Sequence, residues 1–414
     1  MAEGNRKKVR LGLTDKTDVN MDDAILRNAK PKNKYYLSVS RRYNFAKYVV
    51  LIALMCFLLI SLMANRENVT YENLLLLIKD VNLAVQTANK SYETITYSED
   101  SEQTITSYKN NLVVAGASGV KIFSGTGGQV YSGKEKFSKP HAVSSDKYLL
   151  VYDFGGTRFS LYNTFTSVFS DSFDYPITDG AISDSGTFAL VTRTKEYNYS
   201  VMVYSKNCNL INRYRGNEYV IDVAISNDGK RIAIVKIDAE DGYYNTTLML
   251  CEPGKDGVIE TLNLSRVFPV KCTFSDNGDL ALVCDREIYF YDKNGSLMGN
   301  FPILGDLDRI ACRGDYVALS VADNAIQSDN TVIVLDYKGK VKYEGDIRAR
   351  ISDVELYEND LFVLTDTDIR RITLSDEKER SEQVQGYSKE LIVFGRDDVM
   401  LCTPTKAEYV DLRK

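Results

Sequence analysis

The chain has 414 residues, a formal net charge of -6, no Trp and a single His. With one imidazole, multi-histidine metal sites and Ser-His-Asp or Cys-His triads are nearly excluded. About twelve Lys and Arg precede Tyr48 against about five Asp and Glu, so the remainder of the chain carries a charge near -13. This acidic remainder excludes nucleic acid, and argues against an anionic lipid surface, as its partner.

The first 47 residues are mostly polar and basic, which predicts a largely disordered leader. Arg41, Arg42 and Lys47 stand next to an apolar run. The positive-inside rule places such flanks on the cytoplasmic side of a membrane. We therefore expect residues 1–47 in the cytoplasm and the C-terminal domain outside it.

An uncharged apolar run extends from Tyr48 to Ala64. As a helix it spans roughly 25 Å, slightly less than the ~30 Å hydrocarbon core of a bilayer. It predicts one transmembrane signal-anchor helix over residues 48–64 and a single-pass protein of the cell membrane. A cleaved signal peptide is the alternative, but the charged region is too long and no A-x-A-like cleavage site follows.

Residues 65–90 predict a short amphipathic helix beside the membrane. Thr70 is suited to cap it, and Leu74, Leu77 and Ile78 recur at helical spacing. The helix would pack beneath the C-terminal domain or on the lipid surface. A parallel coiled-coil contact is the alternative, although the apolar stripe is shorter than coiled coils usually need.

Residues 91–414 repeat one pattern, a short apolar strand, a tight turn of Ser, Asp, Asn and Gly, and a second strand. The clearest copies run from Ala181 to Val191, from Ala224 to Val235 and from Thr273 to Val283. The Asn-Asp-Gly and Asp-Asn-Gly centres supply the positive φ that hairpin turns require. With weaker copies, about eight turns follow one another at roughly 36 to 49 residues, the period of four-stranded propeller blades. The predicted fold is an all-β propeller of eight blades, with seven as the alternative.

The last repeat predicts how the ring closes. It supplies only three strands, over residues 391–394, 399–402 and 407–412. The segment from Tyr92 to Tyr97 has a strand-like composition and precedes the first repeat. We expect it to complete the last blade, which would leave no long unpaired edge.

No catalytic, cofactor-binding or metal-ligating residue is predicted, no cofactor is expected, and the ligand-binding residues stay unknown. His141 follows Pro140 at the start of a strand and is interpreted as structural. The acidic group from Asp238 to Gly242 lacks the spacing of a calcium loop and predicts a solvated loop between strands. Whether two carboxylates meet across the channel, as a glycosidase needs, is open at this stage.

The cysteines lie in or beside apolar strands, without the spacing of a disulfide scaffold or a metal site. Their even number outside the apolar run would permit disulfides in an oxidising compartment. We instead interpret them as buried thiols that act as small hydrophobic side chains. They are Cys208, Cys251, Cys272, Cys284, Cys312 and Cys402.

The order of basic leader, signal anchor, E-N-L-L-L-L-I helix (Glu72 to Ile78) and repeats with S-D-x-G or S-N-D-G turns resembles a family of uncharacterised, membrane-anchored propeller proteins of Gram-positive bacteria. The repeat is also similar to the WD40-like and YVTN class, although the Gly-His and Trp-Asp pairs of WD40 blades are absent. Without Trp it departs from quinoprotein repeats, so a quinone cofactor is not expected. The resemblance implies a location and a fold, with no assigned activity.

Together these features favour a non-catalytic binding or scaffolding module in the cell envelope, whose loops meet an envelope protein or polymer. One alternative is a transmembrane sensor or regulator that signals through the cytoplasmic leader. Another is an envelope enzyme, which would need clustered acidic residues of raised pKa at one mouth of the propeller channel.

Overall fold

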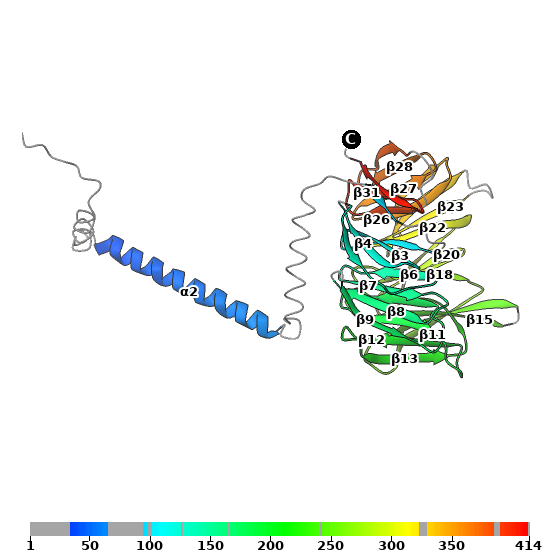
Figure 1. Ribbon diagram of the computed structural model, residues 1–414, viewed down its shortest axis with the longest axis horizontal. Coiled ribbons are helices and arrows are strands. Elements are labelled where there is room, and N and C mark those ends of the chain that lie inside the picture. Colours follow the sequence, from blue (N-terminus) through cyan, green and yellow to red (C-terminus); the bar gives the residue numbers. More distant parts are fainter. Residues whose placement is uncertain are drawn as a thin grey trace, which may run out of the picture. The chain divides into compact units, whose positions relative to one another are not determined.

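A computed structural model describes residues 34–64, 94–97, 102–125, 127–163, 166–240, 242–322, 329–384 and 390–412. The chain divides into two compact units, Met1–Ile78 and Lys79–Lys414. The described part of the first unit is a helix, and that of the second is built from strands (Figure 1).

Helix α2 (Lys34–Ala64) is the described part of the first unit. It begins well before the predicted start at Tyr48, because no Pro or Gly interrupts the sequence from Lys34 onward. Residues 34–47, assigned from the sequence to a largely disordered leader, are therefore helical. Within the described residues no helix has both the length and the apolar character that crossing a membrane requires, so the predicted transmembrane helix over residues 48–64 is not supported. The rest of the leader and nearly all of segment 65–90 lie outside the described residues.

The second unit forms eight four-stranded antiparallel sheets, which are the blades of a propeller. From the innermost strand outward, blades 1 to 4 contain β2 (Thr104–Tyr108), β3 (Asn111–Gly116), β4 (Gly119–Ser124) and β5 (Gln129–Ser132); β6 (Pro140–Ser144), β7 (Tyr148–Asp153), β8 (Arg158–Asn163) and β9 (Thr166–Ser172); β10 (Asp179–Ile182), β11 (Phe188–Thr192), β12 (Tyr199–Tyr204) and β13 (Leu210–Gly216); β14 (Tyr219–Ile225), β15 (Ile232–Glu240), β16 (Tyr243–Cys251) and β17 (Val258–Ser265).

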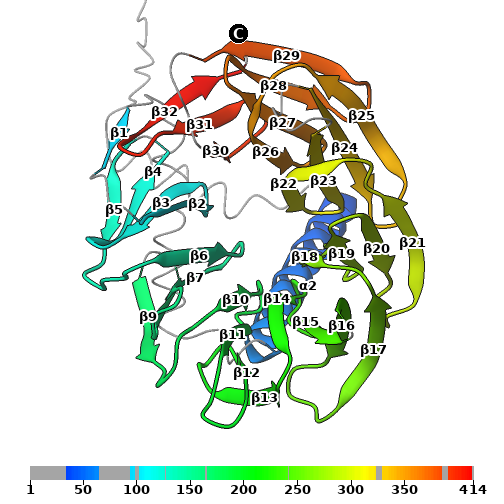
Figure 2. The ribbon, with the colours of Figure 1, turned by 90° about the vertical axis from the view of Figure 1, so that its right-hand side faces the viewer.

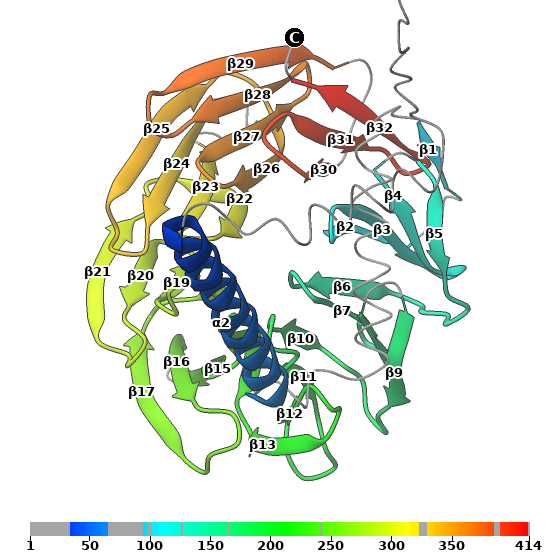
Figure 3. The ribbon, with the colours of Figure 1, turned by 90° about the vertical axis from the view of Figure 1, so that its left-hand side faces the viewer.

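Blades 5 to 8 follow in the same order: β18 (Pro269–Phe274), β19 (Leu280–Cys284), β20 (Glu287–Tyr291) and β21 (Leu297–Pro302); β22 (Asp306–Arg313), β23 (Tyr316–Ala322), β24 (Asn330–Asp336) and β25 (Val341–Ile347); β26 (Ile351–Tyr357), β27 (Asp360–Thr365), β28 (Asp368–Thr373) and β29 (Lys378–Gln383); β30 (Glu390–Val393), β31 (Asp398–Cys402), β32 (Lys406–Asp411) and β1 (Ile95–Thr96). Figures 2 and 3 show the innermost strands of the eight blades around a common centre. The prediction of eight blades is confirmed, and the alternative of seven is wrong.

The ring closes as predicted, by a strand from the start of the domain. Strand β1 pairs antiparallel with β32, with Ile95 opposite Ala407 and Thr96 opposite Lys406. The Tyr97 hydroxyl donates a hydrogen bond of 2.6 Å to the carbonyl oxygen of Thr403. Both ends of the described propeller are thereby held in one blade.

Eight clusters of buried apolar side chains hold the blades together, one between each pair of neighbours. Val191 and Val203 of blade 3 pack against Ile232 of blade 4, for example. The cluster between blades 8 and 1 contains Met400 and Leu112, so the closing contact is as apolar as the others. Because both faces of each blade are covered, the middle strands are almost continuous apolar runs, as the sequence predicted.

Outside the channel, the acidic group that was expected in a loop is partly a strand. Asp238 and Ala239, expected in a solvated loop, belong to the exposed end of β15, which pairs with β16 as a projecting hairpin (Figure 1). The strands extend because their alternating residues continue to pair up to Glu240 and Tyr243.

The cysteines are all free; four of the six predicted buried thiols are buried, whereas Cys208 and Cys312 are partly exposed.

Candidate functional site

The innermost strands of all eight blades line one central channel with a volume of about 890 Å³. One of its mouths is built by the turns that join the first and second strand of each blade. In blades 3, 4 and 5 they are the Ser-Asp-x-Gly and Ser-Asn-Asp-Gly turns of the sequence repeat. Turns of the sequence repeat therefore form part of this mouth of the channel.

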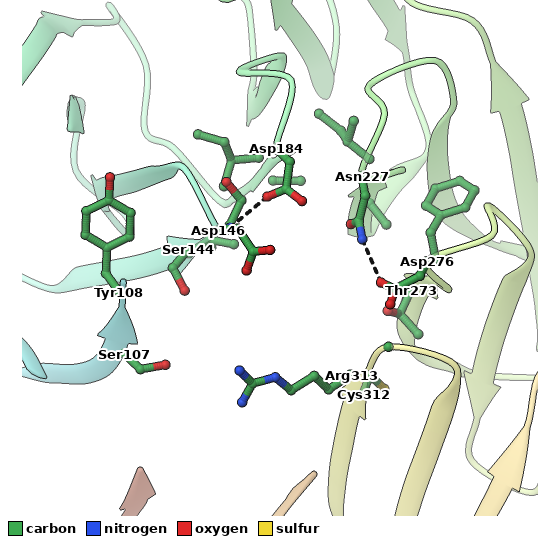
Figure 4. A pocket seen from close by; sticks show the side chains of 18 of the residues that line it. Ser107, Tyr108, Ser144, Asp146, Asp184, Asn227, Thr273, Asp276, Cys312 and Arg313 are labelled. Carbon is green, nitrogen blue, oxygen red and sulfur yellow. Dashed lines mark hydrogen bonds between the residues drawn. The ribbon is translucent and has the colours of Figure 1, made fainter. Parts of the chain in front are cut away.

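The turns of blades 1 to 7 place polar or charged side chains at the mouth. In blade 3 the Ser183 amide donates to the carbonyl of Thr187 over 3.0 Å, and the Gly186 amide donates to the carbonyl of Ser183 over 3.1 Å. Gly186 has a φ of 85°, which L-residues with side chains rarely adopt. The tight turn leaves Asp184 facing the mouth (Figure 4).

Neighbouring turns are tied to one another by the same side chains. Asp184 Oδ1 accepts the amide hydrogen of Asp146 over 2.7 Å, between blades 3 and 2. The Asn227 side-chain amide donates to Asp276 Oδ1 over 2.8 Å, between blades 4 and 5 (Figure 4). The turn residues thus fix the rim of the mouth while they line it.

The carboxylates of the rim lie close enough together to raise the pKa of Asp276. Burial raises the pKa of Asp276, and the nearby carboxylates of Asp315, Asp146 and Asp184 raise it further. Arg313 points into the same space (Figure 4). Its guanidinium lies 4.8 Å from the ring centroid of Tyr357.

Further from the mouth, carboxylates of three inner strands join neighbouring blades. Each accepts a backbone amide of the next inner strand: Asp179 from Val223 over 2.8 Å, Asp222 from Cys272 over 2.5 Å, and Asp353 from Leu391 over 2.7 Å. We call these three contacts the inter-blade clasps. They orient the inner strands and satisfy amides that would otherwise be unpaired in the wall.

The clasp carboxylates of Asp179 and Asp222 are shielded from water, and this raises their pKa values. Burial and the neighbouring Asp222 raise the pKa of Asp179 to about 7. Burial also raises the pKa of Asp222, while Lys271 opposes the shift through a salt bridge of 3.0 Å. Burial lowers the pKa of Lys271, but Asp222 and Asp179 outweigh it, so the pKa is raised. Half of the Lys271 side chain is open to the channel, so water moderates these effects.

Glu355 differs from the clasp residues. It lies in the wall on β26, where burial and the charge of Asp353 raise its pKa to about 8. Arg313 lowers that pKa only in part. Among the described residues, no Lys, Arg or His comes within 4.0 Å of its carboxylate, and its hydrogen-bonding partner is the adjacent Leu356 amide.

His141 also lines the channel, at the start of β6. Its ring stacks on Phe154 at 4.9 Å between centroids. Burial and Lys139 lower its pKa. The stacking supports the structural interpretation of His141.

The sequence reasoning missed the charged residues of the wall. Asp179, Asp222 and Lys271 each stand five positions before the turn residue of their blade, and His141 holds the same place in blade 2. Superimposing the repeats on their turns would have revealed this polar position. Of the acidic group, Asp238, Ala239 and Gly242 are described in full, and none of these three lines the channel. Within the described ranges, no three His, Cys, Asp or Glu side chains converge as a metal site would require.

Solved propellers are similar in fold. BamB from Moraxella catarrhalis shares 11% identity with this chain, covers 78% of it and 98% of its own length, and gives a TM-score of 0.50. Sqt1 from Saccharomyces cerevisiae shares 11% identity over 79% of this chain and 100% of its own, with a TM-score of 0.55. Sqt1 from Chaetomium thermophilum, solved bound to the N-terminus of the ribosomal protein L10, shares 12% over 77% and 98%, with a TM-score of 0.53. At these identities the likeness shows the fold alone.

The sequence comparisons complete the assignment. No curated protein matches the chain. Residues 85–412 match a family of unknown function, DUF5711, and this span includes the whole described propeller. The chain therefore belongs to the DUF5711 family, whose fold in this protein is an eight-bladed β-propeller.

Proposed function

We propose that this propeller is a non-catalytic protein-binding module that uses the mouth formed by the Ser-Asp turns as its binding face. The observation that carries the proposal is the central channel of about 890 Å³, which is lined by all eight blades and has polar turn residues at its rim. Concave sites of this size suit a small ligand or an inserted segment of a larger one.

Two further observations support this proposal. The apolar clusters between the blades make the ring a rigid support, and binding loops on a rigid support lose little entropy on binding. The Chaetomium thermophilum Sqt1 propeller, similar in fold, was solved with the N-terminus of another protein bound. A propeller of this kind is thus able to hold a chain terminus.

We further propose that the propeller is tethered at the outer side of the cell membrane, with an envelope protein or polymer as its partner. The support is in the sequence, namely the uncharged run from Tyr48 to Ala64 and the basic residues before it. Protease treatment of intact cells tests this placement. Digestion of the propeller is expected, and protection of the propeller until the cells are lysed would contradict it.

An acid–base enzyme is the second candidate, and Glu355 is the observation that favours it. A carboxyl group with a pKa near 8 is protonated at neutral pH, as a general acid must be. The clasp carboxylates are occupied by backbone amides, which argues against their service as the second catalytic group. Hydrolysis of an envelope polymer by the wild type but not by E355Q would establish the enzyme.

Site-specific photocrosslinking in living cells tests the binding face. One probe residue replaces Asp184 at the mouth, and a matched control replaces Leu304, which is 82% exposed. Leu304 precedes β22, whose other end reaches the mouth at Arg313, so the two probes lie at opposite ends of the inner strands. Crosslinks to a discrete protein from the Asp184 position alone are expected. Equal yields from both positions, or crosslinks from Leu304 alone, would overturn the proposal.

A further inference from the structure

Three aromatic side chains are exposed on blades 4 and 5, at the end of the propeller away from the mouth. Tyr219 is 63% exposed, Tyr244 is 52% exposed and Phe268 is 37% exposed. Tyr219 begins β14 and Phe268 precedes β18, and both strands reach the mouth at their other ends. None of the three side chains lines the channel. We call them the aromatic patch. Because exposed apolar groups that lie together mark interaction surfaces, the patch is a second surface that a ligand can use.

The pairing of the strands brings the patch together. Tyr219 pairs with Ile237 across β14 and β15. Tyr244 pairs with Ala239, which stands two residues further along β15, so Tyr219 and Tyr244 point to the same face of blade 4. The Tyr244 ring packs edge-to-face with the ring of Phe268, at 5.4 Å between centroids and 74° between planes. Phe268 belongs to the connection between β17 and β18, so the patch joins blade 4 to blade 5.

Backbone hydrogen bonds fix the segments that carry Tyr244 and Phe268. The carbonyl oxygen of Tyr244 accepts the amide hydrogen of Arg266 over 2.8 Å. The Phe268 amide donates to Asp285 Oδ1 over 3.1 Å, and the Asp285 amide donates to the carbonyl oxygen of Phe268 over 2.9 Å. Aromatic side chains have few rotatable bonds, so rings on a fixed backbone lose little entropy when a ligand stacks on them.

The size of the patch and the charge of the chain decide which ligand it suits. Three aromatic side chains with these exposed fractions offer about 300 Å², whereas a stable protein interface needs about 800 Å² from each partner. The charge near -13 of the chain after residue 47 repels polyanions. A neutral sugar meets neither obstacle, because the C–H groups on one face of a sugar ring stack on the electron-rich face of an aromatic ring without any counter-charge.

We infer that the aromatic patch binds a neutral polysaccharide, whose sugar rings stack on Tyr219 and Tyr244 while Phe268 holds the Tyr244 ring in place. Both tyrosines lie on one face of blade 4, so the polysaccharide would run across the strands of that blade. The patch and the mouth lie at opposite ends of the inner strands. Binding at the patch is therefore independent of the proposed binding at the mouth.

Binding of neutral tetrasaccharides to the full chain tests the inference. The probes are N-acetylated chitotetraose, cellotetraose and maltotetraose, which carry no charge and differ in linkage. Saturation-transfer NMR detects contact, and a titration compares the Kd of the wild type with those of Tyr244→Ala, Tyr219→Ala and the ring-preserving Tyr244→Phe.

Tyr243→Ala is the matched control. Tyr243 is adjacent to Tyr244 on β16 and is 50% exposed, but its side chain points to the opposite face of the sheet. The guanidinium of Arg266 covers its ring, 4.1 Å from the ring centroid. The control therefore removes an equally exposed tyrosine outside the patch.

We expect the wild type to bind at least one of the three sugars, and Tyr244→Ala and Tyr219→Ala to bind it about five- to tenfold more weakly, since each loses one stacked ring. Tyr244→Phe and Tyr243→Ala should stay within about twofold of the wild type, because both keep the rings of the patch. Crosslinks from the Asp184 position should be unchanged in Tyr244→Ala, so the two surfaces are tested apart.

Absence of binding of all three sugars to the wild type would overturn the inference, as would equal losses in Tyr244→Ala and Tyr243→Ala. Polyglutamate serves as the anionic probe. Tighter binding of polyglutamate than of any sugar, lost in Tyr244→Ala, would overturn the inference in favour of an anionic partner.

Discussion

Two parts of the channel wall hold carboxyl groups of raised pKa, and they differ in their partners. In blades 3 to 5, Asp179 and Asp222 accept backbone amides, and Asp222 also pairs with Lys271. In blade 7, Glu355 has the adjacent amide but no cation within ion-pairing distance among the described residues. The comparison teaches that a raised pKa alone does not identify a functional group. Asp179 and Asp222 accept amides of the next blade and so join neighbouring blades, whereas Glu355 accepts only the amide next to it in the chain.

The largest expected effect comes from breaking a clasp. Asp222 is only 5% exposed, and replacing it with Ala leaves the Cys272 amide and the Lys271 ammonium without their partner. We expect the free energy of unfolding to fall by about 3 kcal/mol, discounted because Lys271 is half open to the channel. Urea unfolding of Asp222→Ala measures the loss. A loss below about 0.5 kcal/mol, as expected for the exposed control Asp238→Ala, would show that the clasp is not structural.

Removing the charge of Glu355 should increase the free energy of unfolding, in contrast to the loss expected for Asp222→Ala. The pKa of Glu355 is raised by burial from the ordinary 4.5 to about 8, so the folded state binds its proton more tightly than the unfolded state. The stability that this gives is present below pH 4.5 and is lost as the pH rises toward 8. At pH 8 the Glu355→Gln variant should be about 2 kcal/mol more stable than the wild type. Thermal unfolding from pH 4 to pH 9 measures the slope, and parallel curves for both proteins would contradict the prediction.

A smaller effect is expected from replacing Asp353, which is a clasp carboxylate and also raises the pKa of Glu355. The charge of Asp353 raises the pKa of Glu355, so Asp353→Asn should lower that pKa while the Asn carbonyl keeps an acceptor for the Leu391 amide. We expect a stability change of about 1 kcal/mol or less at pH 5, and the loss of stability that starts near the ordinary pKa of Glu355 should end at a lower pH, and be smaller, than in the wild type. The same pH series measures it. An unshifted titration would mean that the two side chains do not interact.

The fold could be predicted from the sequence because its signals are local. Each Ser-Asp-x-Gly or Ser-Asn-Asp-Gly turn fixes one hairpin, and the count of hairpins gives the blades. The closing strand was predictable because the last repeat lacks one strand and the start of the domain supplies it. The length of α2 was missed because its apolar part is only half of an uninterrupted helical sequence.

The site was harder to predict because its contacts join residues of different blades. The hydrogen bond from Val223 to Asp179 spans two blades and depends on the register between them. Asp353 stands five residues before Glu358, as Asp179 does before Asp184, but the repeat does not show that its partner is the Leu391 amide. That partner belongs to the next blade, so only the assembled propeller reveals it.

Hydrogen–deuterium exchange of the full chain, with and without its crosslinked partner, tests the binding face most directly. A partner seated in the channel mouth should protect the turns at Asp184, Asp276 and Arg313, which lie on three different blades. The exposed outer strands β13 and β29 should exchange as they do in the free protein. Protection confined to those outer strands, with unchanged turns, would contradict binding at the mouth.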